Sequence, residues 1–213
     1  MKTLLGLSPL QISQYFAQWN QGELSSYLME ISAHILTVTD PDTGRPLVEQ
    51  VLGEAGSKGT GMWTVQEALA QGVPLPTIAQ AVFARDLSCQ SAARTAMAAL
   101  NPRPAAVPPA DPDAFAEQIR RALYASKLCS YAQGFHLLQK ASQTYGWDLA
   151  LDQIALLFRG GCIIRAAFLN RLADAYRANP VLENLLLDPG FSRTLLDYQE
   201  DWRRVAAAAA QQG

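Results

Sequence analysis

Ser57-Lys58-Gly59-Thr60-Gly61-Met62-Trp63 joins two segments with helical periodicity and is the most distinctive stretch of this sequence. Two glycines bracket a threonine and a lysine precedes them, which predicts a tight connection between helices. A cation and a hydroxyl beside flexible backbone at the start of a helix are groups that an anion such as a phosphate requires. The residues alone leave an alternative open, namely a helix–turn–helix corner with Thr60 as N-cap and Lys58 in solvent.

Upstream of this glycine corner (residues 57–63), the sequence predicts two helices and a polar loop. Ser8 and Pro9 are typical of an N-cap and a first helical residue, and apolar residues follow at helical spacing to Trp19. Glu23 opens a second predicted helix, which extends to about residue 35. Residues 39–46 favour turns throughout and predict a polar loop or short hairpin. A brief helix over about 47–52 is expected to lead into the corner.

Downstream, the pattern continues as a helix to Gly72, and residues 78–100 predict one long alanine-rich helix. Five prolines between residues 101 and 112, without helical period, predict a surface crossover. A long helix is expected over about 113–145. Gly134 in its interior costs about 1 kcal/mol relative to alanine, which indicates close packing against another helix.

The C-terminal third predicts further helices over about 151–158, 162–177, 182–187 and 192–210. Glycine and proline residues lie between these predicted helices and mark their ends. No stretch has a convincing strand pattern. The predicted fold class is therefore all-α, with long helices packed face to face.

The composition is that of a globular chain with a sizeable core, since 49% of its 213 residues are hydrophobic and 17% are charged. A net charge of −2 provides no basic surface, so nucleic acid is not an expected partner. The three cysteines are far apart and are expected to be small core residues of a reduced protein. No apolar run reaches the roughly 18 residues of a membrane span. The expectation is a soluble, cytoplasmic protein that does not act at membranes.

The order of the predicted helices, and several stretches in detail, match a known family. The family signature runs through residues 51–63, Val-Leu-Gly-Glu-Ala-Gly-Ser-Lys-Gly-Thr-Gly-Met-Trp. Further matching stretches lie at residues 19–28, 81–85 (Ala-Val-Phe-Ala-Arg), 130–135 (Ser-Tyr-Ala-Gln-Gly-Phe), 162–166 (Cys-Ile-Ile-Arg-Ala) and 184–187 (Asn-Leu-Leu-Leu). The chain resembles the C-terminal, all-helical half of 6-phosphogluconate dehydrogenases. The resemblance covers nearly the whole chain, so residues 1–213 are interpreted as one such helical domain with a crossover at about 101–112.

The resemblance implies an NADP-dependent oxidative decarboxylation of 6-phosphogluconate to ribulose 5-phosphate, in the pentose phosphate pathway. It also implies that Lys58, Thr60 and Arg85 bind the substrate phosphate. Two cations and one hydroxyl suit a dianion, because charge-assisted hydrogen bonds are stronger than neutral ones. Without the resemblance, Arg85 would be interpreted as a rim arginine whose stem lies along the core.

The sequence departs from the family pattern at three positions. The family has aspartate where this chain has Gly53, often lysine at Met62, and alanine at Gly160. Gly53 removes a carboxylate and is expected to loosen the end of the preceding helix. Met62 removes a positive charge. These changes could reflect a divergent member or relaxed constraint.

Several parts of the family's machinery have no match in this sequence. NADP is the family's cofactor, but no glycine-rich dinucleotide fingerprint follows a strand pattern here. No residue matches the family's catalytic lysine and glutamate, nor the arginine and histidine of its C-terminal tail. Without coenzyme, acid and base, this chain alone is expected not to be a competent dehydrogenase. His34 and His136 are isolated, so no metal site is expected.

Two classes of function therefore stay open. In the first, the chain is the substrate-binding and dimerisation part of a 6-phosphogluconate dehydrogenase, as a piece of a longer protein or a split gene product. In the second, it is a helical binding or assembly module that retains the fold but not the reaction. The resemblance also implies a homodimer, since the helical halves form the dimer in this family, and the expectation is a dimer or a marginally stable monomer with exposed apolar surface.

Overall fold

The structure, a computed structural model, describes residues 1–101 and 105–212. Within those ranges the only β-type pairings are two isolated bridges, Ser26–Ala166 and Thr39–Pro46. The all-α prediction is confirmed. The elements are α1 (Lys2–Leu5), α2 (Pro9–Trp19), α3 (Tyr27–Ile35), η1 (Leu47–Glu49), α4 (Thr60–Gln71), α5 (Pro76–Ser88), α6 (Ser91–Leu100), α7 (Pro112–Tyr145), α8 (Leu151–Leu157), α9 (Leu169–Ala178), η2 (Leu185–Leu187) and α10 (Pro189–Gln212).

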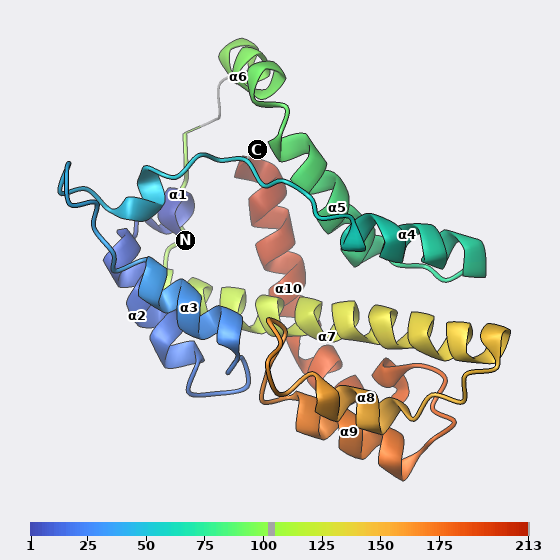
Figure 1. The fold of residues 1–213 in the computed structure, drawn as a ribbon. Coiled ribbons are helices and arrows are strands. Elements are labelled where there is room, and N and C mark those ends of the chain that lie inside the picture. The colour runs from blue at the N-terminus through green and yellow to red at the C-terminus, as the bar shows by residue number, and fades with distance from the viewer. Residues whose placement is uncertain (102–104, 213) are drawn as a thin grey trace.

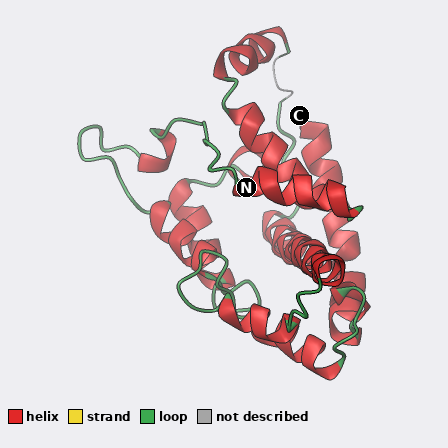
Figure 2. Ribbon diagram, turned by 45° about the vertical axis from the view of Figure 1, so that its right-hand side comes forward, coloured by secondary structure: helices red, strands yellow, loops and turns green. Residues whose placement is uncertain are grey.

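The 34-residue helix α7 is the element on which the others are assembled. Asp111 caps its start by accepting a hydrogen bond from the Ala114 backbone N–H at 3.0 Å, and Pro112 occupies the first helical position. Gly146, with φ 68°, ends it in the left-handed conformation. Helices α2 and α3 lie near its start, α8 and α9 near its end, and α10 crosses it (Figure 1). Figure 2 looks more nearly along α7 and shows helices around it.

Two clusters of buried side chains hold these helices on α7. The larger joins α7 to α9, α10 and the end of α2, and a smaller one seats the turn between α4 and α5 on α7. The largest fully buried members of the main cluster are Leu24, Tyr124, Leu128, Phe135, Leu169, Leu172, Leu185 and Phe191. The smaller cluster consists of Ala68, Val73, Leu75 and Leu137. Because both clusters include residues of α7, each burial also orders that helix.

The start of the second helix was predicted too early. The first helix begins as expected, with Ser8 and Gln11 forming a capping box. The second begins at Tyr27 rather than at Glu23, because the Ser26 side chain caps it by accepting from the Met29 N–H at 3.3 Å. Residues 39–46 do close as a short hairpin-like loop, with the Asp40 N–H donating to the Arg45 carbonyl at 2.8 Å.

The single helix predicted over 78–100 is wrong, since α5 and α6 are separated at Cys89 and Gln90. The Ser88 hydroxyl donates to the Arg85 carbonyl at 2.6 Å, and Arg94 Nη1 donates to the Ser88 carbonyl at 2.9 Å. These side chains use backbone acceptors at the end of α5, so the alanine-rich pattern is interrupted despite its high helix propensity.

The helix predicted over 162–177 is also shorter than expected, because α9 begins only at Leu169. Residues before it pair with the turn before α3. The Tyr27 N–H donates to the Arg165 carbonyl at 3.0 Å, and the Ala167 N–H donates to the Ser25 carbonyl at 2.9 Å. A long-range pairing of this kind has no local sequence signal. The helices predicted over 182–187 and 47–52 are only the short 3-10 turns η2 and η1.

The structure also bears on Gly134, the cysteines and the predicted crossover. A Cβ added at Gly134 would meet no atom within 4 Å, so the predicted close packing there is not found among the described residues. The cysteines are not core residues, because Cys89 is exposed and Cys129 and Cys162 are partly buried. In the predicted crossover, residues 105–111 lack helix, and residues 102–104 lie outside the described residues.

None of the described helices combines the length and apolarity needed to cross a bilayer.

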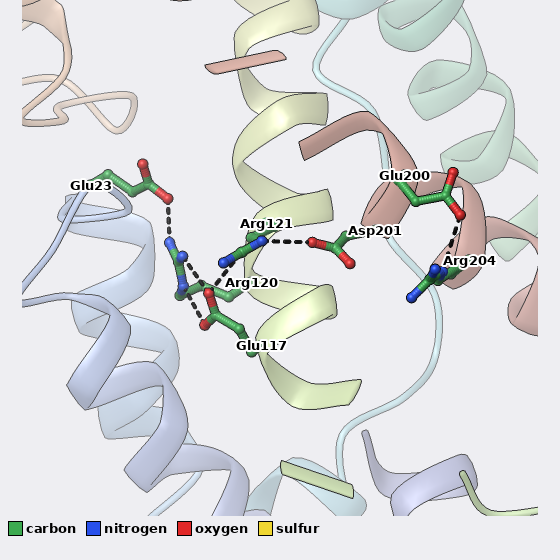
Figure 3. Close-up of polar contacts among 7 residues, drawn as sticks. All are labelled: Glu23, Glu117, Arg120, Arg121, Glu200, Asp201 and Arg204. Carbon is green, nitrogen blue, oxygen red and sulfur yellow. Dashed lines mark hydrogen bonds and ion pairs between the residues drawn. The ribbon is translucent and has the colours of Figure 1, made fainter. Parts of the chain in front are cut away.

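A network of ion pairs fastens the turn before α3 and helix α10 to the first half of α7 (Figure 3). Arg120 donates to both carboxylate oxygens of Glu117, at 2.7 and 2.6 Å, and to Glu23. Arg121 donates to Glu117 at 2.9 Å and to Asp201 at 3.0 Å. The hydrogen bond from Arg120 is the largest cause that lowers the pKa of Glu117. Glu117 therefore holds two arginines that reach opposite sides of α7.

Replacing Glu117 by glutamine is expected to lower the free energy of unfolding by about 1 kcal/mol at neutral pH, since Glu117 is 44% exposed and solvent screens its pairs. The folded pKa is depressed, so the stabilisation is present above the unfolded pKa near 4.3 and is lost as pH falls through the folded pKa. Urea unfolding of both proteins across this pH range measures the difference. Glu200→Gln, which removes only an exposed pair with Arg204, is the control and should have a smaller effect. A Glu117→Gln deficit that persists at the acid end of the series would contradict this assignment.

Candidate functional site

The glycine corner opens helix α4 through a left-handed residue. Gly59 is the N-cap, with φ 93°, and Thr60 is the first helical residue. The alternative interpretation in which Thr60 is the N-cap is therefore wrong, and the Thr60 hydroxyl does not cap the helix. The Ser57 hydroxyl accepts a hydrogen bond from the Gly59 N–H at 3.2 Å, which helps to hold this turn. A residue with a Cβ would be strained at Gly59.

The segment before the corner is bound to the end of α5. The Ala55 N–H donates to the Ser88 hydroxyl at 2.9 Å, and the Cys89 thiol donates to the Ala55 carbonyl at 3.6 Å. Arg94 Nη1, which contacts the Ser88 carbonyl, also donates to the Gly53 carbonyl at 3.1 Å. These bonds fasten an otherwise irregular segment of chain to the joint between α5 and α6.

The segment after the corner is also in contact with α5. Gly61 lies so close to this helix that an added Cβ would be 3.0 Å from Val82 Cγ2. Lys58 and Thr60 thus lie between two points of contact with α5, at Ser88 and at Val82. Arg85 is three residues from each of these contacts. The fold therefore brings the corner alongside the last two turns of α5, which carry Arg85.

The three predicted site residues are all exposed. Among the described residues, the side chains of Lys58, Thr60 and Arg85 form no hydrogen bond or ion pair. The first turn of α4 adds backbone N–H groups that have no acceptor within the helix. Two free cations, one hydroxyl and these amides can together bind an anion through charge-assisted hydrogen bonds.

The three departures from the family pattern are sterically unconstrained. A Cβ added at Gly53 or Gly160 would meet no atom within 4 Å, and Met62 is 46% exposed. Gly53 was expected to loosen the end of a helix, but the preceding turn η1 already ends at Glu49. Instead, the carbonyl of Gly53 is held by Arg94.

The histidines do not lie in a cluster of metal ligands. His136 Nδ1 lies 3.2 Å from the Glu183 carbonyl, and His34 is exposed near the end of α3. In the part of the chain that the structure describes, no group of three or more His, Cys, Asp or Glu side chains is placed to hold a metal ion.

The sequence patterns did not reveal the structural roles of two residues, Arg94 and Lys127. Arg94 breaks the apolar pattern of residues 78–100, and the structure shows that it ties the corner segment to α5. That break was the one available signal. Lys127 was not singled out at all, although it lies half-buried in α7 beside an apolar cavity. A single lysine in a long amphipathic helix has no pattern that distinguishes it.

An all-helical domain assembled on one long helix, with an exposed candidate anion site at a helix start, is the class of protein that this geometry defines. The whole chain, residues 1–213, matches the family "6-phosphogluconate dehydrogenase, C-terminal domain". The chain belongs to this family.

Relatives of known function agree with this assignment. The chain is 48% identical over 214 residues to the NADP(+)-dependent, decarboxylating 6-phosphogluconate dehydrogenase of Bacillus subtilis, covering 100% of this chain and 46% of that protein. It is 51% identical to the decarboxylating 6-phosphogluconate dehydrogenase of Synechococcus elongatus, with the same coverage. The chain thus spans about half the length of the curated relatives it matches.

A solved structure shows the same fold. It is that of Plasmodium falciparum 6-phosphogluconate dehydrogenase, described in its apo form and in complex with its cofactor NADP+ and its substrate 6-phosphogluconate. The TM-score is 0.96 at 40% sequence identity, and the match covers 100% of this chain and 46% of that one. The predicted family and fold are confirmed.

Gly59→Ala is expected to lower the free energy of unfolding by about 1–2 kcal/mol, because alanine is strained at positive φ. The new methyl group would also lie 3.2 Å from the Trp63 ring. Gly53→Ala is the matched control, since its Cβ meets nothing within 4 Å and its φ is not positive. Chemical denaturation of the two variants measures the difference. Equal stabilities would show that the left-handed turn at Gly59 is not required.

Proposed function

We propose that this chain is the substrate-binding and dimerisation part of a 6-phosphogluconate dehydrogenase, and that Lys58, Thr60 and Arg85 hold the phosphate of 6-phosphogluconate. The whole protein would carry out the NADP-dependent, decarboxylating reaction named for its relatives. The cytoplasmic location expected from the composition stays a prediction.

One observation carries this proposal. The corner that holds Lys58 and Thr60 is fastened to α5 on both sides of those residues, at Ser88 and Val82, and Arg85 lies between these contacts on α5. Their side chains have no other bonding partner among the described residues. Cationic side chains without an ion-pair partner are expected to be solvated unless a ligand binds them. A phosphate dianion can accept hydrogen bonds from Lys58, Thr60 and Arg85 at once.

The contribution of these residues would be binding and orientation rather than chemistry. Holding the phosphate fixes one end of the sugar acid, so the carbon to be oxidised lies at a set distance from the corner. When bound, NADP supplies the acceptor of the hydride. In the described ranges no glycine-rich strand–turn–helix offers a dinucleotide a binding site, and no step is assigned through NADP.

The phosphate assignment is tested by calorimetry with 6-phosphogluconate on the wild-type chain and on Lys58→Ala/Arg85→Ala. A hydrogen bond from a charged donor contributes about 1.5–3 kcal/mol. Each of the two substitutions in this double variant should therefore weaken binding of 6-phosphogluconate by roughly 10- to 100-fold. Lys140→Ala, which removes an exposed lysine of α7, is the control and should leave binding unchanged.

Gluconate, which lacks the phosphate, separates the two parts of the ligand. It should bind weakly to the wild-type chain and equally weakly to the double variant. Binding of 6-phosphogluconate that is unchanged in the double variant would disprove the phosphate site. Such a result would favour the second function, a non-catalytic helical module, for which the loss of charge at Gly53 and Met62 is the supporting observation.

NADPH formation by the chain alone, which we do not expect, would show that the chain carries out part of the reaction in addition to binding the substrate.

We propose further that α5 and α6 pack against a second copy of the chain. Neither helix has a buried residue in the described part of the chain. Large apolar side chains on both are exposed, namely Phe83 (60%), Leu87 (55%), Met97 (61%) and Leu100 (79%). In Figure 1, α6 stands away from the other helices. An apolar surface of this kind on a globular protein marks an interaction site.

Sedimentation velocity at tens of micromolar is expected to show a dimer for the wild-type chain. Met97→Glu with Leu100→Glu should give a monomer, because two carboxylates would be desolvated at the contact. Leu157→Glu changes an equally exposed leucine on α8 and should leave the dimer intact. A well-behaved wild-type monomer at this concentration would count against the proposal.

A further inference from the structure

An apolar cavity lies away from the glycine corner, and none of its lining residues belongs to α5 or α6. Its volume is about 420 Å³, within the usual range of small-molecule sites. It opens between the α2–α3 region, the middle of α7 and the loop that precedes α9. Its walls are largely apolar: Phe16, Leu28, Met29, Leu123, Ile163 and Ile164. No residue of the cavity belongs to the glycine corner or to α5.

One cation, Lys127 of α7, lines this cavity without a counterion. Its Nζ lies 4.9 Å from the centre of the Phe168 ring, and no carboxylate of the described residues pairs with it. Arg165 also lines the cavity, but it is paired with Glu30 at 3.2 Å. Burial lowers the pKa of Lys127 to about 8, as expected where the charged form is poorly solvated.

The hydroxyls around the cavity differ in whether they are free to bind a ligand. Tyr131 donates to the Ile164 carbonyl at 2.8 Å, and Ser26 donates to the Leu24 carbonyl at 2.9 Å. Burial raises the pKa of the Tyr131 hydroxyl to about 12, and Cys162 adds to this shift, so Tyr131 supplies no anion to Lys127 near neutral pH. The Ser32 hydroxyl lines the cavity and has no hydrogen-bond partner among the described residues.

We propose that this cavity binds a small aliphatic monocarboxylate, with its carboxylate on Lys127 Nζ and its alkyl chain against the apolar walls. A single negative charge matches the one unpaired cation. A phosphate dianion would leave one charge uncompensated in apolar surroundings, which is costly. The Ser32 hydroxyl supplies a second donor to the carboxylate. The alkyl chain replaces water on surfaces that have no hydrogen bonds to offer it.

Isothermal titration of the 213-residue chain with butanoate, hexanoate and octanoate tests the proposal. The affinity should rise about fourfold for each added methylene, the transfer value for a buried CH₂ group. Lys127→Met keeps the length of the side chain without its charge and should weaken octanoate binding at least about tenfold. The same variant should bind 1-octanol as the wild-type chain does. Ser32→Leu narrows the cavity and should weaken both ligands, and Lys140→Met on the same helix is the neutral control.

The pH dependence of the wild-type chain provides a test that needs no variant. Octanoate affinity should be highest below about pH 8, fall as the pH rises through that value and Lys127 loses its proton, and level off near the affinity of Lys127→Met. The affinity for 1-octanol should not change over the same range. The absence of saturable octanoate binding, an affinity independent of chain length, or equal binding by the wild-type chain and Lys127→Met would each overturn the proposal.

Discussion

The burial of the apolar face of α7 is the interaction on which the rest of the structure depends. Tyr124, Leu128 and Phe135 of this helix are fully or almost fully buried, and each lies in the cluster shared with α9 and α10. Burying a large apolar side chain contributes about 1.5–3 kcal/mol, so these contacts dominate over the hydrogen bonds at the helix ends. The ion pairs of Arg120 and Arg121 act on the same helix but on its half-exposed sides, where solvent screening limits them. These ion pairs therefore help to determine how α10 and the turn before α3 pack on α7, and they contribute little to the stability of the core.

The candidate phosphate site depends on a different set of contacts. Its corner is not part of the main core, and the nearest buried cluster is the small one at the far end of α4 and the start of α5. What places Lys58 and Thr60 beside Arg85 is a group of hydrogen bonds between the backbone of residues 53–55 and the side chains of Ser88, Cys89 and Arg94. Such bonds contribute about 1 kcal/mol each, and these are exposed to water. The site is therefore positioned by a few weak contacts on a helix pair that is anchored at one end.

Much of this could be predicted from the sequence, and the failures have a common cause. Ser8-Pro9 and Gly72 mark helix ends by local chemistry, and those ends were right. The late start at Leu169 arises from a partner distant in sequence, Ser25, and the break at Cys89 arises from side-chain to backbone hydrogen bonds of Ser88 and Arg94. Local periodicity contains no information on such partners. The glycine corner was recognisable because Gly59 needs a backbone conformation that few other residues adopt, whereas Lys127 acquires its environment only from packing.

The location of the candidate site on α4 and α5 also has an energetic consequence. Helices with few buried contacts open at low free energy, so α5 and α6 belong to the least stable part of the fold. A phosphate held by Lys58, Thr60 and Arg85 would bridge the corner and α5, and a second copy packed on Phe83 and Met97 would cover the same helices. The phosphate ligand and the second copy would each stabilise the packing of α4 against α5, because both bind only when these helices are folded and in contact. Substrate binding and self-association are then coupled through the order of α5, without a change in the core around α7.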